Sequence, residues 1–227
     1  MNHLTVSIPA YNEEKNIIPL IYDVLDVCER IGTDFQIFIV NDGSTDDTEA
    51  VIQQHFAGHS RISIHRHLKN MGFGQTISDC FTIPDSEWIM NLSGDNQFPA
   101  ENIRIMFEQT GTYEVILGNR TRRHDNLYRK LVSKIYNRIV SKMAGVRIND
   151  VSSILLVKKA LIRNTEFKST SGFIHTEIAL EALKHSSRFT EVDLLHKERE
   201  YGTASGGKLR TILSTISEMI KYVLGIL

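Results

Sequence analysis

The chain has 227 residues, of which 41% are hydrophobic and 23% charged, and its formal net charge at pH 7 is -1. This length allows a substantial core in one large domain, and the composition is ordinary for a globular protein. The net charge excludes a global attraction to nucleic acid, which is not expected as a partner, so any basic surface must be local. We see no secretory signal and no run of about 20 apolar residues, and therefore expect a cytoplasmic protein.

The first half of the chain alternates predicted strands with predicted helices. Short apolar or β-branched runs that end in turn residues predict strands at 4–12, 35–44, 61–67, 87–93 and 114–120. Helical spacing of apolar residues, or cap residues at the start, predicts helices between them at 13–31, 45–56 and 74–83. This alternation predicts an α/β fold: a mainly parallel, twisted sheet with helices on both faces.

Polar clusters follow the predicted strands. They read PAYNE, NDGSTD, KNMGFG, SGDNQ and GNRTRR. Each cluster alone is ordinary turn chemistry, in which glycine stands beside aspartate or asparagine. In a doubly wound sheet, however, ligands bind at the carboxyl ends of the strands, where such clusters meet. Five clusters in corresponding places therefore indicate a functional site.

The second half of the chain is richer in amphipathic helices. In the predicted helix 127–145, Leu131, Ile135 and Ile139 recur at a spacing of four. A basic stripe stands beside them, formed by Lys130, Lys134, Arg138 and Lys142. This helix either contacts a membrane surface or packs on its own core with solvated lysines. The remaining predicted elements are a strand at 151–159, a helix at 173–185, a strand at 188–196 and an amphipathic helix at 208–227, whose apolar stripe is expected to face the core or a homodimer interface.

Two of the polar clusters contain carboxylates for which the residues alone leave two roles open. Asp42 ends an apolar strand and could accept hydrogen bonds from a nucleotide, or only shape a tight turn. Asp95 in SGDNQ could ligate a metal ion, or only turn the chain. No P-loop is present, and no G-x-G-x-x-G follows the first strand, which argues against kinase and dehydrogenase functions.

Histidines show no spacing typical of a metal site. His65 and His67 share one face of a predicted strand, and His175 and His196 stand alone. We therefore expect exposed or core histidines at these positions.

Four ordered motifs carry a resemblance to a known family. VSIPAYNEEKNI, IVNDGSTDDT, KNMGFGQTI and MNLSGDNQFP occur in this order, and GNRTRR, YRKLVSKIYNRI and HKEREYGTASGGKL extend the match. The chain resembles the inverting glycosyltransferases with the GT-A fold, most of all their dolichol-phosphate mannosyltransferase and polyprenyl-phosphate glycosyltransferase branch. The resemblance implies a single GT-A domain over 1–227, with a nucleotide-sugar-binding half (1–119) and an acceptor-binding half with amphipathic helices (120–227).

The resemblance also implies roles for individual residues. A GDP- or UDP-linked sugar donor would contact Pro9, Ala10, Tyr11, Glu13, Asp42, Gly94, Asp95, Arg199 and Ser205. The catalytic residues would be Asp95, Arg120 and Arg129, with the two arginines binding the phosphate of the acceptor. The implied activity is sugar transfer to a polyprenyl phosphate by a protein that is peripheral at the inner, cytoplasmic face of a membrane.

The resemblance further implies a divalent cation, Mg²⁺ or Mn²⁺. Asp95 falls on the second aspartate of the family's D-x-D motif and Gln97 on the glutamine that follows it, so both would be metal ligands. The departure is Ser93, which stands where the family has its first aspartate, and SSILLVKK also lacks the usual glycine and arginine. A cation neutralises the leaving diphosphate, and carboxylates are its usual protein ligands. One aspartate and one amide carbonyl should therefore bind metal more weakly than two aspartates.

The acceptor decides whether a catalytic base is required. A lipid phosphate has a second pKa near about 6 and is largely deprotonated at neutral pH, so it needs no base. The alternative acceptor, a saccharide hydroxyl in glycan synthesis, would need one, and Asp150 and Glu177 are the candidates. A third possibility is a degenerate binding or scaffold protein without turnover, which Ser93 makes conceivable.

Overall fold

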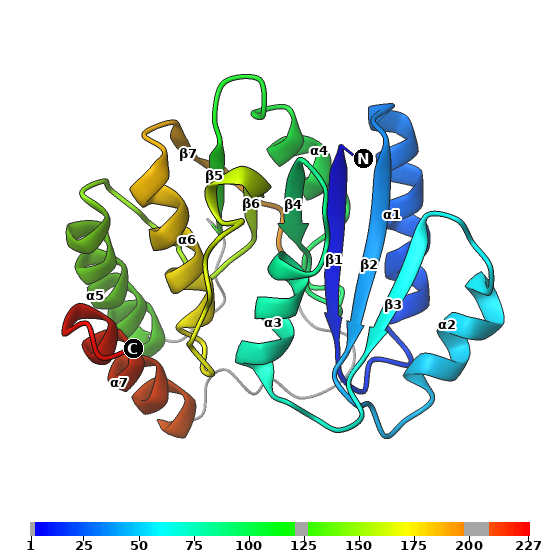
Figure 1. The fold of residues 1–227 in the computed structure, drawn as a ribbon, viewed down its shortest axis with the longest axis horizontal. Helices are drawn as coiled ribbons and strands as arrows, with labels where there is room; N and C mark the ends of the chain where they lie inside the picture. Colours follow the sequence, from blue (N-terminus) through cyan, green and yellow to red (C-terminus); the bar gives the residue numbers. More distant parts are fainter. Residues whose placement is uncertain (1–2, 121–126, 198–208) are drawn as a thin grey trace.

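A twisted sheet forms the centre of the protein (Figure 1). The structure, a computed structural model, describes residues 3–120, 127–197 and 209–227. Among these residues the strands are β1 (Leu4–Ala10), β2 (Phe35–Asn41), β3 (Ile62–Arg66), β4 (Trp88–Asn91), β5 (Val115–Asn119), β6 (Leu155–Lys158) and β7 (Phe189–Asp193). Their order across the sheet is β3-β2-β1-β4-β6-β5-β7. β6 is antiparallel to β4 and β5, and the other strands share one direction.

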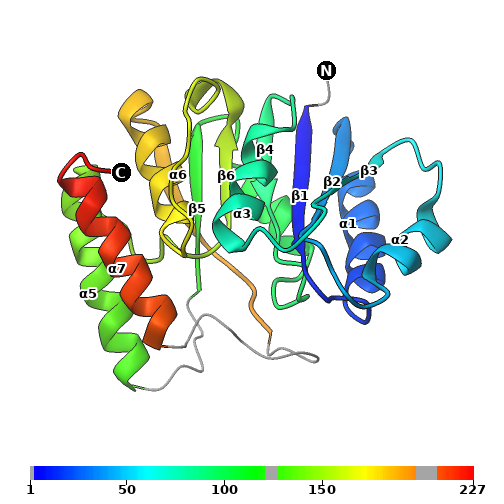
Figure 2. The same ribbon diagram turned by 60° about the horizontal axis from the view of Figure 1, so that its bottom comes forward.

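Helices cover both faces of this sheet (Figures 1 and 2). They are α1 (Ile17–Ile31), α2 (Thr48–Phe56), α3 (Phe73–Thr82), α4 (Glu101–Phe107), α5 (Leu127–Ala144), the 3-10 helix η1 (Lys159–Leu161), α6 (Ile174–His185) and α7 (Leu209–Val223). Side chains of α1, α2 and α4 join one hydrophobic core, and side chains of α3, α5, α6 and α7 join the other. Two cores arise because successive side chains of a strand point to opposite faces of the sheet. In β2, Ile37 and Ile39 belong to the first core, whereas Phe38 and Val40 belong to the second.

The predicted α/β architecture is confirmed, with two features that periodicity did not indicate. β6 opposes its neighbours and lies between β4 and β5, so a strand from the second half of the chain completes the sheet of the first half. The short helix α4 begins at Glu101, soon after the SGDNQ cluster. The single domain over 1–227 and its division at residue 119 stay predictions.

The carboxyl ends of the parallel strands lie along one edge of the sheet, the lower edge in Figure 1. β2 and β3 lie on one side of β1, and β4 lies on its other side. Doubly wound sheets bind ligands at such a reversal of strand order, next to the strand ends. The loops that follow β1 and β4 therefore mark the expected place of a ligand.

Candidate functional site

The loops after β1 and β2 are tied to each other at this edge. Asn12 has a left-handed backbone (φ 57°), and its side-chain oxygen accepts a hydrogen bond of 2.8 Å from the backbone N–H of Thr45. The backbone N–H of Glu13 donates to the hydroxyl of Thr48, the first residue of α2, at 2.8 Å. Tyr11 is 44% exposed, so its ring is accessible for stacking on a base.

Asp42 is buried directly after β2, and its carboxylate joins several segments. Its backbone N–H donates to the carbonyl oxygen of Ala10 at 2.9 Å, which fixes Asp42 beside the end of β1. Its Oδ1 accepts a hydrogen bond from the N–H of Met71 at 2.7 Å, and its Oδ2 accepts one from the N–H of Gly72 at 3.0 Å. Oδ1 also lies 2.7 Å from Nδ1 of His67. The carboxylate therefore organises the loop between β3 and α3, and its contact with a nucleotide stays a prediction.

The SGDNQ cluster after β4 is a turn, and this turn lies where the strand order reverses. Oδ1 of Asp95 accepts a hydrogen bond from the N–H of Gln97 at 3.1 Å, a local bond typical of aspartate in turns. Asn96 has a left-handed backbone (φ 56°). A Cβ on Gly94 would lie 2.6 Å from the carbonyl oxygen of Pro9, so only glycine allows the turn to pack this closely on β1. The SGDNQ segment therefore has the geometry of a turn and also lies beside the expected ligand.

The oxygen atoms of this turn fit a hard divalent cation. Asp95 contributes a carboxylate, Gln97 an amide carbonyl and Ser93 a hydroxyl. Within the described part of the chain, the buried side-chain oxygen of Asn96 accepts no hydrogen bond, which leaves a further oxygen for a ligand. Mg²⁺ and Mn²⁺ prefer oxygen donors of these kinds. The donor set therefore fits the expected metal, with one formal negative charge where the family has two.

A second grouping of possible metal ligands consists of His65, His67 and Asp79. Carboxylates engage both ring nitrogens of His67: Nδ1 faces Asp42, and Nε2 lies 2.8 Å from Asp79. Burial lowers the pKa of His67, but the hydrogen bonds to Asp42 and Asp79 outweigh burial, so the pKa is raised. We therefore assign this grouping to ion pairing. Sequence spacing missed it because the partners of His67 come from the loop after β2 and from α3.

The segment after β7 crosses the same edge toward the Asp95 turn. The N–H of Leu194 donates to the carbonyl oxygen of Asn119 at 2.9 Å, and the N–H of Lys197 donates to that of Gln97 at 2.8 Å. Lys197 precedes Arg199 by two residues in the sequence. Arg199 and Ser205, both expected to contact the donor, lie outside the described residues.

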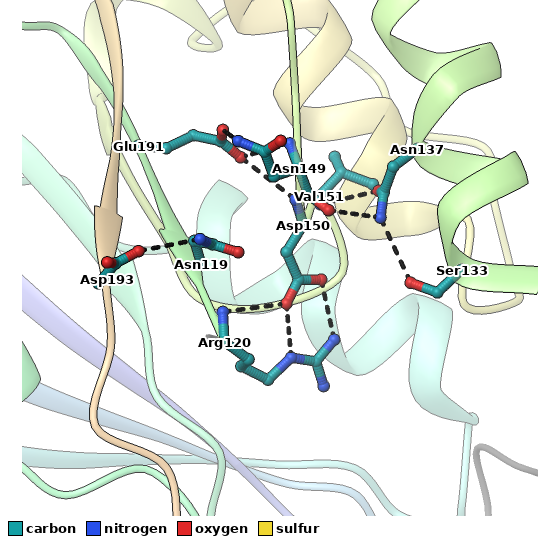
Figure 3. A network of polar contacts seen from close by, with 9 residues as sticks. All are labelled: Asn119, Arg120, Ser133, Asn137, Asn149, Asp150, Val151, Glu191 and Asp193. Carbon is teal, nitrogen blue, oxygen red and sulfur yellow. Dashed lines mark hydrogen bonds and ion pairs between the residues drawn. The ribbon is translucent and has the colours of Figure 1, made fainter. Parts of the chain in front are cut away.

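Arg120 and Asp150, which sequence reasoning assigned to different reactions, form one ion pair (Figure 3). Nε of Arg120 donates to Oδ2 of Asp150 at 2.7 Å, and Nη2 donates to Oδ1 at 2.9 Å. The side chain of Asp150 is 3% exposed and that of Arg120 is 20% exposed. Such a two-point contact fixes the plane of the guanidinium group. Arg129 lies in α5, but its side chain is outside the described part of the structure.

A basic pocket of about 610 Å³ lies beside this ion pair, and we call it the α5 pocket. Its lining comes from the end of β5, from α5 and from the segment 147–150: Asn119, Arg120, Lys130, Ser133, Lys134, Asn137, Arg138, Ser141, Arg147, Ile148, Asn149 and Asp150. Asp150 is the one acid of this lining. Within the described residues, no ion pair involves Lys130, Lys134, Arg138 or Arg147. Counting only the residues that the structure describes, the positive charge of the pocket is thus largely uncompensated.

Hydrogen bonds hold the segment 147–150 in place (Figure 3). The carboxylate of Glu191 accepts hydrogen bonds from the N–H of Asn149 at 2.8 Å and from its side-chain amide at 2.6 Å. On the other side, the amide of Asn137 donates to the carbonyl oxygen of Asn149 at 2.7 Å and accepts from the N–H of Val151 at 3.2 Å. The wall of the pocket that carries Asp150 is therefore anchored to both β7 and α5.

Glu177 anchors a different segment, in the first turn of α6. Its oxygens accept hydrogen bonds from the backbone N–H groups of Lys168 at 3.1 Å and Ser169 at 2.9 Å. The residue is 4% exposed. These contacts favour a structural role for Glu177, and its role as a base for a hydroxyl acceptor stays a prediction without geometric support.

Replacing Glu177 with glutamine is expected to lower the free energy of unfolding by about 1–3 kcal/mol, because the amide NH₂ would face a buried N–H that needs an acceptor. Transfer per folded molecule should stay unchanged. Denaturant unfolding and a transfer assay measure the two effects, and Glu166→Gln, at a position nearby in the sequence, is the matched control. Loss of turnover without loss of stability would instead identify Glu177 as a base.

His175 is a buried histidine in the first turn of α6. Its Nε2 lies 3.0 Å from the side-chain amide nitrogen of Asn91, which donates to it. Burial, and secondarily the charge of Arg120, lowers the pKa of His175 to about 4. It is therefore neutral at physiological pH, as a core histidine is expected to be.

Comparison with known proteins relates this architecture to curated sequences. Residues 5–180 match the family model described as glycosyl transferase family 2. The undecaprenyl-phosphate 4-deoxy-4-formamido-L-arabinose transferases of Pectobacterium atrosepticum and Pectobacterium carotovorum are each 30% identical to this chain, over 215 and 220 residues. Each match covers 93% of this chain and 65% of the relative, so the chain spans less than two thirds of the length of these relatives.

Solved structures share the fold. Glucosyl-3-phosphoglycerate synthase from Mycobacterium tuberculosis, in complex with Mn²⁺, UDP and glucosyl-3-phosphoglycerate, has a TM-score of 0.71 at 13% identity, over 100% of this chain and 81% of that chain. S. aureus TarS, in complex with UDP-GlcNAc, has a TM-score of 0.62 at 16% identity, over 93% and 61%. Both likenesses bear out the expected GT-A fold. Together with the family match over most of the sequence, they lead to the conclusion that this chain belongs to glycosyl transferase family 2.

Proposed function

We propose that this chain transfers a sugar from a nucleoside diphosphate to a polyprenyl phosphate, with inversion and with the help of a divalent cation. The observation that carries the acceptor class is the α5 pocket, whose described lining has several cationic side chains and one acid and so suits a phosphate. Exposed apolar side chains on the same helix suit a lipid chain. The names of the undecaprenyl-phosphate transferases support the same class of acceptor.

The donor would lie where the strand order reverses, against the loops after β1, β2 and β4. Tyr11 is exposed there and offers a face to the base, while Pro9, Ala10 and Glu13 shape the adjoining wall. The complexes of the two solved relatives with UDP or UDP-GlcNAc favour a uridine donor. The bond between Lys197 and Gln97 brings the described end of the segment 194–197 to the turn proposed for the cation. Contacts of Arg199 and Ser205 with the donor are proposed on their sequence positions alone.

Asp95 and Gln97 would hold the cation, because their oxygens are hard donors on the turn beside β1. When bound, the cation would neutralise charge on the leaving diphosphate. Ser93 would contribute at most a hydroxyl or a water contact. The ligand set then carries the single negative charge of Asp95, so we expect weaker metal affinity than in relatives with two aspartates.

Arg120 would bind the phosphate of the acceptor at the mouth of the α5 pocket. Its fork with Asp150 holds the guanidinium in place, so less side-chain freedom is lost when a phosphate arrives. Lys130 and Lys134 add positive charge from α5. A lipid phosphate is already a nucleophile at neutral pH, so Asp150 is needed as a partner of Arg120 and not as a base. Arg129 is proposed for the same phosphate on its sequence position.

The lipid chain would lie against α5 and α7, which run side by side in both views (Figures 1 and 2). Leu131, Ile135 and Ile139 of α5 are 58%, 53% and 38% exposed, and α7 and the residue after it expose Leu213, Ile220, Val223 and Leu224. No helix among the described residues is long and apolar enough to cross a bilayer. We propose that these two helices lie in the surface of a membrane, which would bring the adjoining α5 pocket to the lipid headgroups.

Replacing Ile135 with serine is expected to weaken binding to lipid vesicles about fivefold or more. Full burial of an isoleucine side chain contributes about 1.5–3 kcal/mol to binding. Roughly half of the Ile135 side-chain surface is exposed in the free protein, so about half of this free energy is available on docking to the membrane. Vesicle sedimentation measures the effect, and Ile83→Ser, a change at an exposed isoleucine of the α3 end, is the matched control.

Varying salt and lipid charge separates the contribution of the basic residues of α5 to vesicle binding from that of its apolar residues. Vesicles with anionic lipid should bind more strongly than neutral ones, and salt should weaken this preference because exposed charges are screened. If the parent and Ile135→Ser proteins bind vesicles equally, and if the parent self-associates whereas Ile135→Ser does not, the exposed apolar residues of α5 belong to a homodimer interface instead.

The direct test of the proposed function follows labelled sugar from UDP- and GDP-linked donors. The expected result is label in the organic phase only when polyprenyl phosphate and a divalent cation are both present. Label on a water-soluble saccharide would favour transfer to a hydroxyl. Nucleotide binding without any transfer or donor hydrolysis would favour the non-catalytic binding protein.

A further inference from the structure

We propose that His67 is a positioning residue for nucleotide binding, because it holds Asp42 and, through Asp42, the loop between β3 and α3. This inference rests on the proposed donor site at the carboxyl edge of β1 and β2. It concerns a residue that sequence spacing left as an ordinary histidine. Neither the family match nor the related proteins assign a role to it.

The imidazole of His67 is enclosed by two carboxylates from different elements. Nδ1 lies 2.7 Å from Asp42 Oδ1, and Nε2 lies 2.8 Å from Asp79 Oδ2. The side chains of His67, Asp42 and Asp79 are 7%, 5% and 13% exposed. A carboxylate can only accept a hydrogen bond, and a neutral imidazole has only one N–H to donate. Both contacts are therefore satisfied together only by the imidazolium form of His67.

The loop that depends on this contact approaches the proposed donor. Asp42 accepts the N–H groups of Met71 and Gly72, and Gly72 has a left-handed backbone (φ 90°) at the start of α3. A Cβ on Gly43 would lie 2.5 Å from the carbonyl carbon of Lys69, so the loops after β2 and β3 pack backbone against backbone. If Asp42 turned away, the N–H groups of Met71 and Gly72 would lose their acceptors, and the position of this loop against the loop after β2 would change.

Protonation of His67 should therefore govern nucleotide affinity. The groups that face the ring are Asp42 from the loop after β2, Asp79 from α3 and His65 from β3, the strand that ends just before His67. The ring centroid of His65 lies 5.4 Å from that of His67. Gln75 of α3 donates to the other oxygen of Asp79 at 2.8 Å. The pKa of His67 is raised in the folded protein, so the contacts are complete below its unfolded value and are lost as pH rises through the folded value. Affinity and stability should fall together in that window.

Asp79→Asn tests this inference sharply. The amide nitrogen that this substitution introduces could donate to a neutral Nε2, while Nδ1–H of His67 donates to Asp42 and the new amide oxygen still accepts from Gln75. The network would then be complete without a proton on Nε2. His67→Gln, in contrast, can donate to Asp42 but cannot span both neighbours.

The experiment is titration of UDP and GDP with Mn²⁺ across a pH series, with parent, Asp79→Asn, His67→Gln and the control His65→Gln. We expect the nucleotide affinity of the parent and of His65→Gln to fall as pH rises. The affinity of Asp79→Asn should not depend on pH and should equal that of the parent at acidic pH. The affinity of His67→Gln should also not depend on pH but should be about tenfold weaker. Thermal unfolding over the same series measures stability separately. A purely structural role would change stability without changing the pH profile of nucleotide affinity.

Two outcomes would overturn the inference. The first is an imidazole of His67 that stays neutral in NMR titration at acidic pH. The second is the same pH profile of nucleotide affinity in the parent and in Asp79→Asn. Absence of nucleotide binding to the parent at every pH would instead refute the donor site on which the inference rests, and the NMR titration would still report on the ion pair.

Discussion

Asp95→Asn is expected to abolish metal-dependent binding of nucleoside diphosphate. The substitution keeps the shape of the side chain and can keep the turn bond to the N–H of Gln97, which needs only an acceptor oxygen. It removes the one formal negative charge of the proposed ligand set, which a divalent cation requires most. Isothermal titration of UDP or GDP, with and without Mn²⁺, measures the effect, and sugar transfer should fall by about 100-fold or more.

Changes at Ser93 give the complementary result. Ser93→Ala should have little effect, whereas Ser93→Asp should tighten metal binding because it adds a second carboxylate in the family's usual place. Asp47→Asn, which removes a carboxylate from the loop after β2, is the control for net charge. If Mn²⁺ does not help the parent protein bind nucleotide, or if Asp95→Asn binds as well as the parent, the SGDNQ segment is only a turn.

The mainly parallel character of the sheet and the edge where its loops meet were predictable from the sequence, because both follow from local patterns. Buried parallel strands appear as continuous apolar runs, and the glycine, asparagine and aspartate after each run mark the loops. The antiparallel β6 was not predictable in this way. Whether LLVK pairs with β4 in one direction or the other depends on partners more than 60 residues away, and periodicity carries no such information.

Individual side chains at the site were predictable in type but not in partner. Asp150 and Glu177 are the right residue types for a base, yet one forms an ion pair with Arg120 and the other anchors the backbone at 168–169. His67 acquires its role from Asp42 and Asp79, which are 25 and 12 residues distant. Burial and long-range pairing decide these roles, and neither can be read from spacing within one segment.

Arg120→Ala is expected to slow sugar transfer about 100-fold or more while nucleotide affinity stays nearly unchanged. Within the described residues, the proposed donor contacts lie at the end of β1 and on the loops after β1, β2 and β4, whereas Arg120 follows β5 and lines the α5 pocket. Arg120→Lys should restore transfer only in part, because an ammonium group cannot form the two-point contact that the guanidinium forms with a phosphate or with Asp150. Steady-state kinetics with varied polyprenyl phosphate measure the rate of transfer, and titration of nucleotide measures the nucleotide affinity.

Arg120→Ala alone is an ambiguous variant, since it removes the guanidinium that compensates the buried charge of Asp150 and so threatens folding. The double variant Arg120→Ala/Asp150→Asn removes both charges and should be more stable than Arg120→Ala, which unfolding measurements can verify. Its transfer should nevertheless be as slow as that of the single variant, because the acceptor phosphate has lost its ligand.

Asp150→Asn distinguishes the two proposed roles of this carboxylate. If Asp150 only orients Arg120, the amide oxygen still accepts one hydrogen bond from the guanidinium. Transfer to polyprenyl phosphate should then fall modestly, by about tenfold, with an unchanged pH profile. If Asp150 is a base for a hydroxyl acceptor, transfer should fall by about 100-fold or more, and the acidic limb of the pH profile should disappear. The second pattern would move the acceptor from a lipid phosphate to a saccharide, and the first would retain the α5 pocket as its phosphate site.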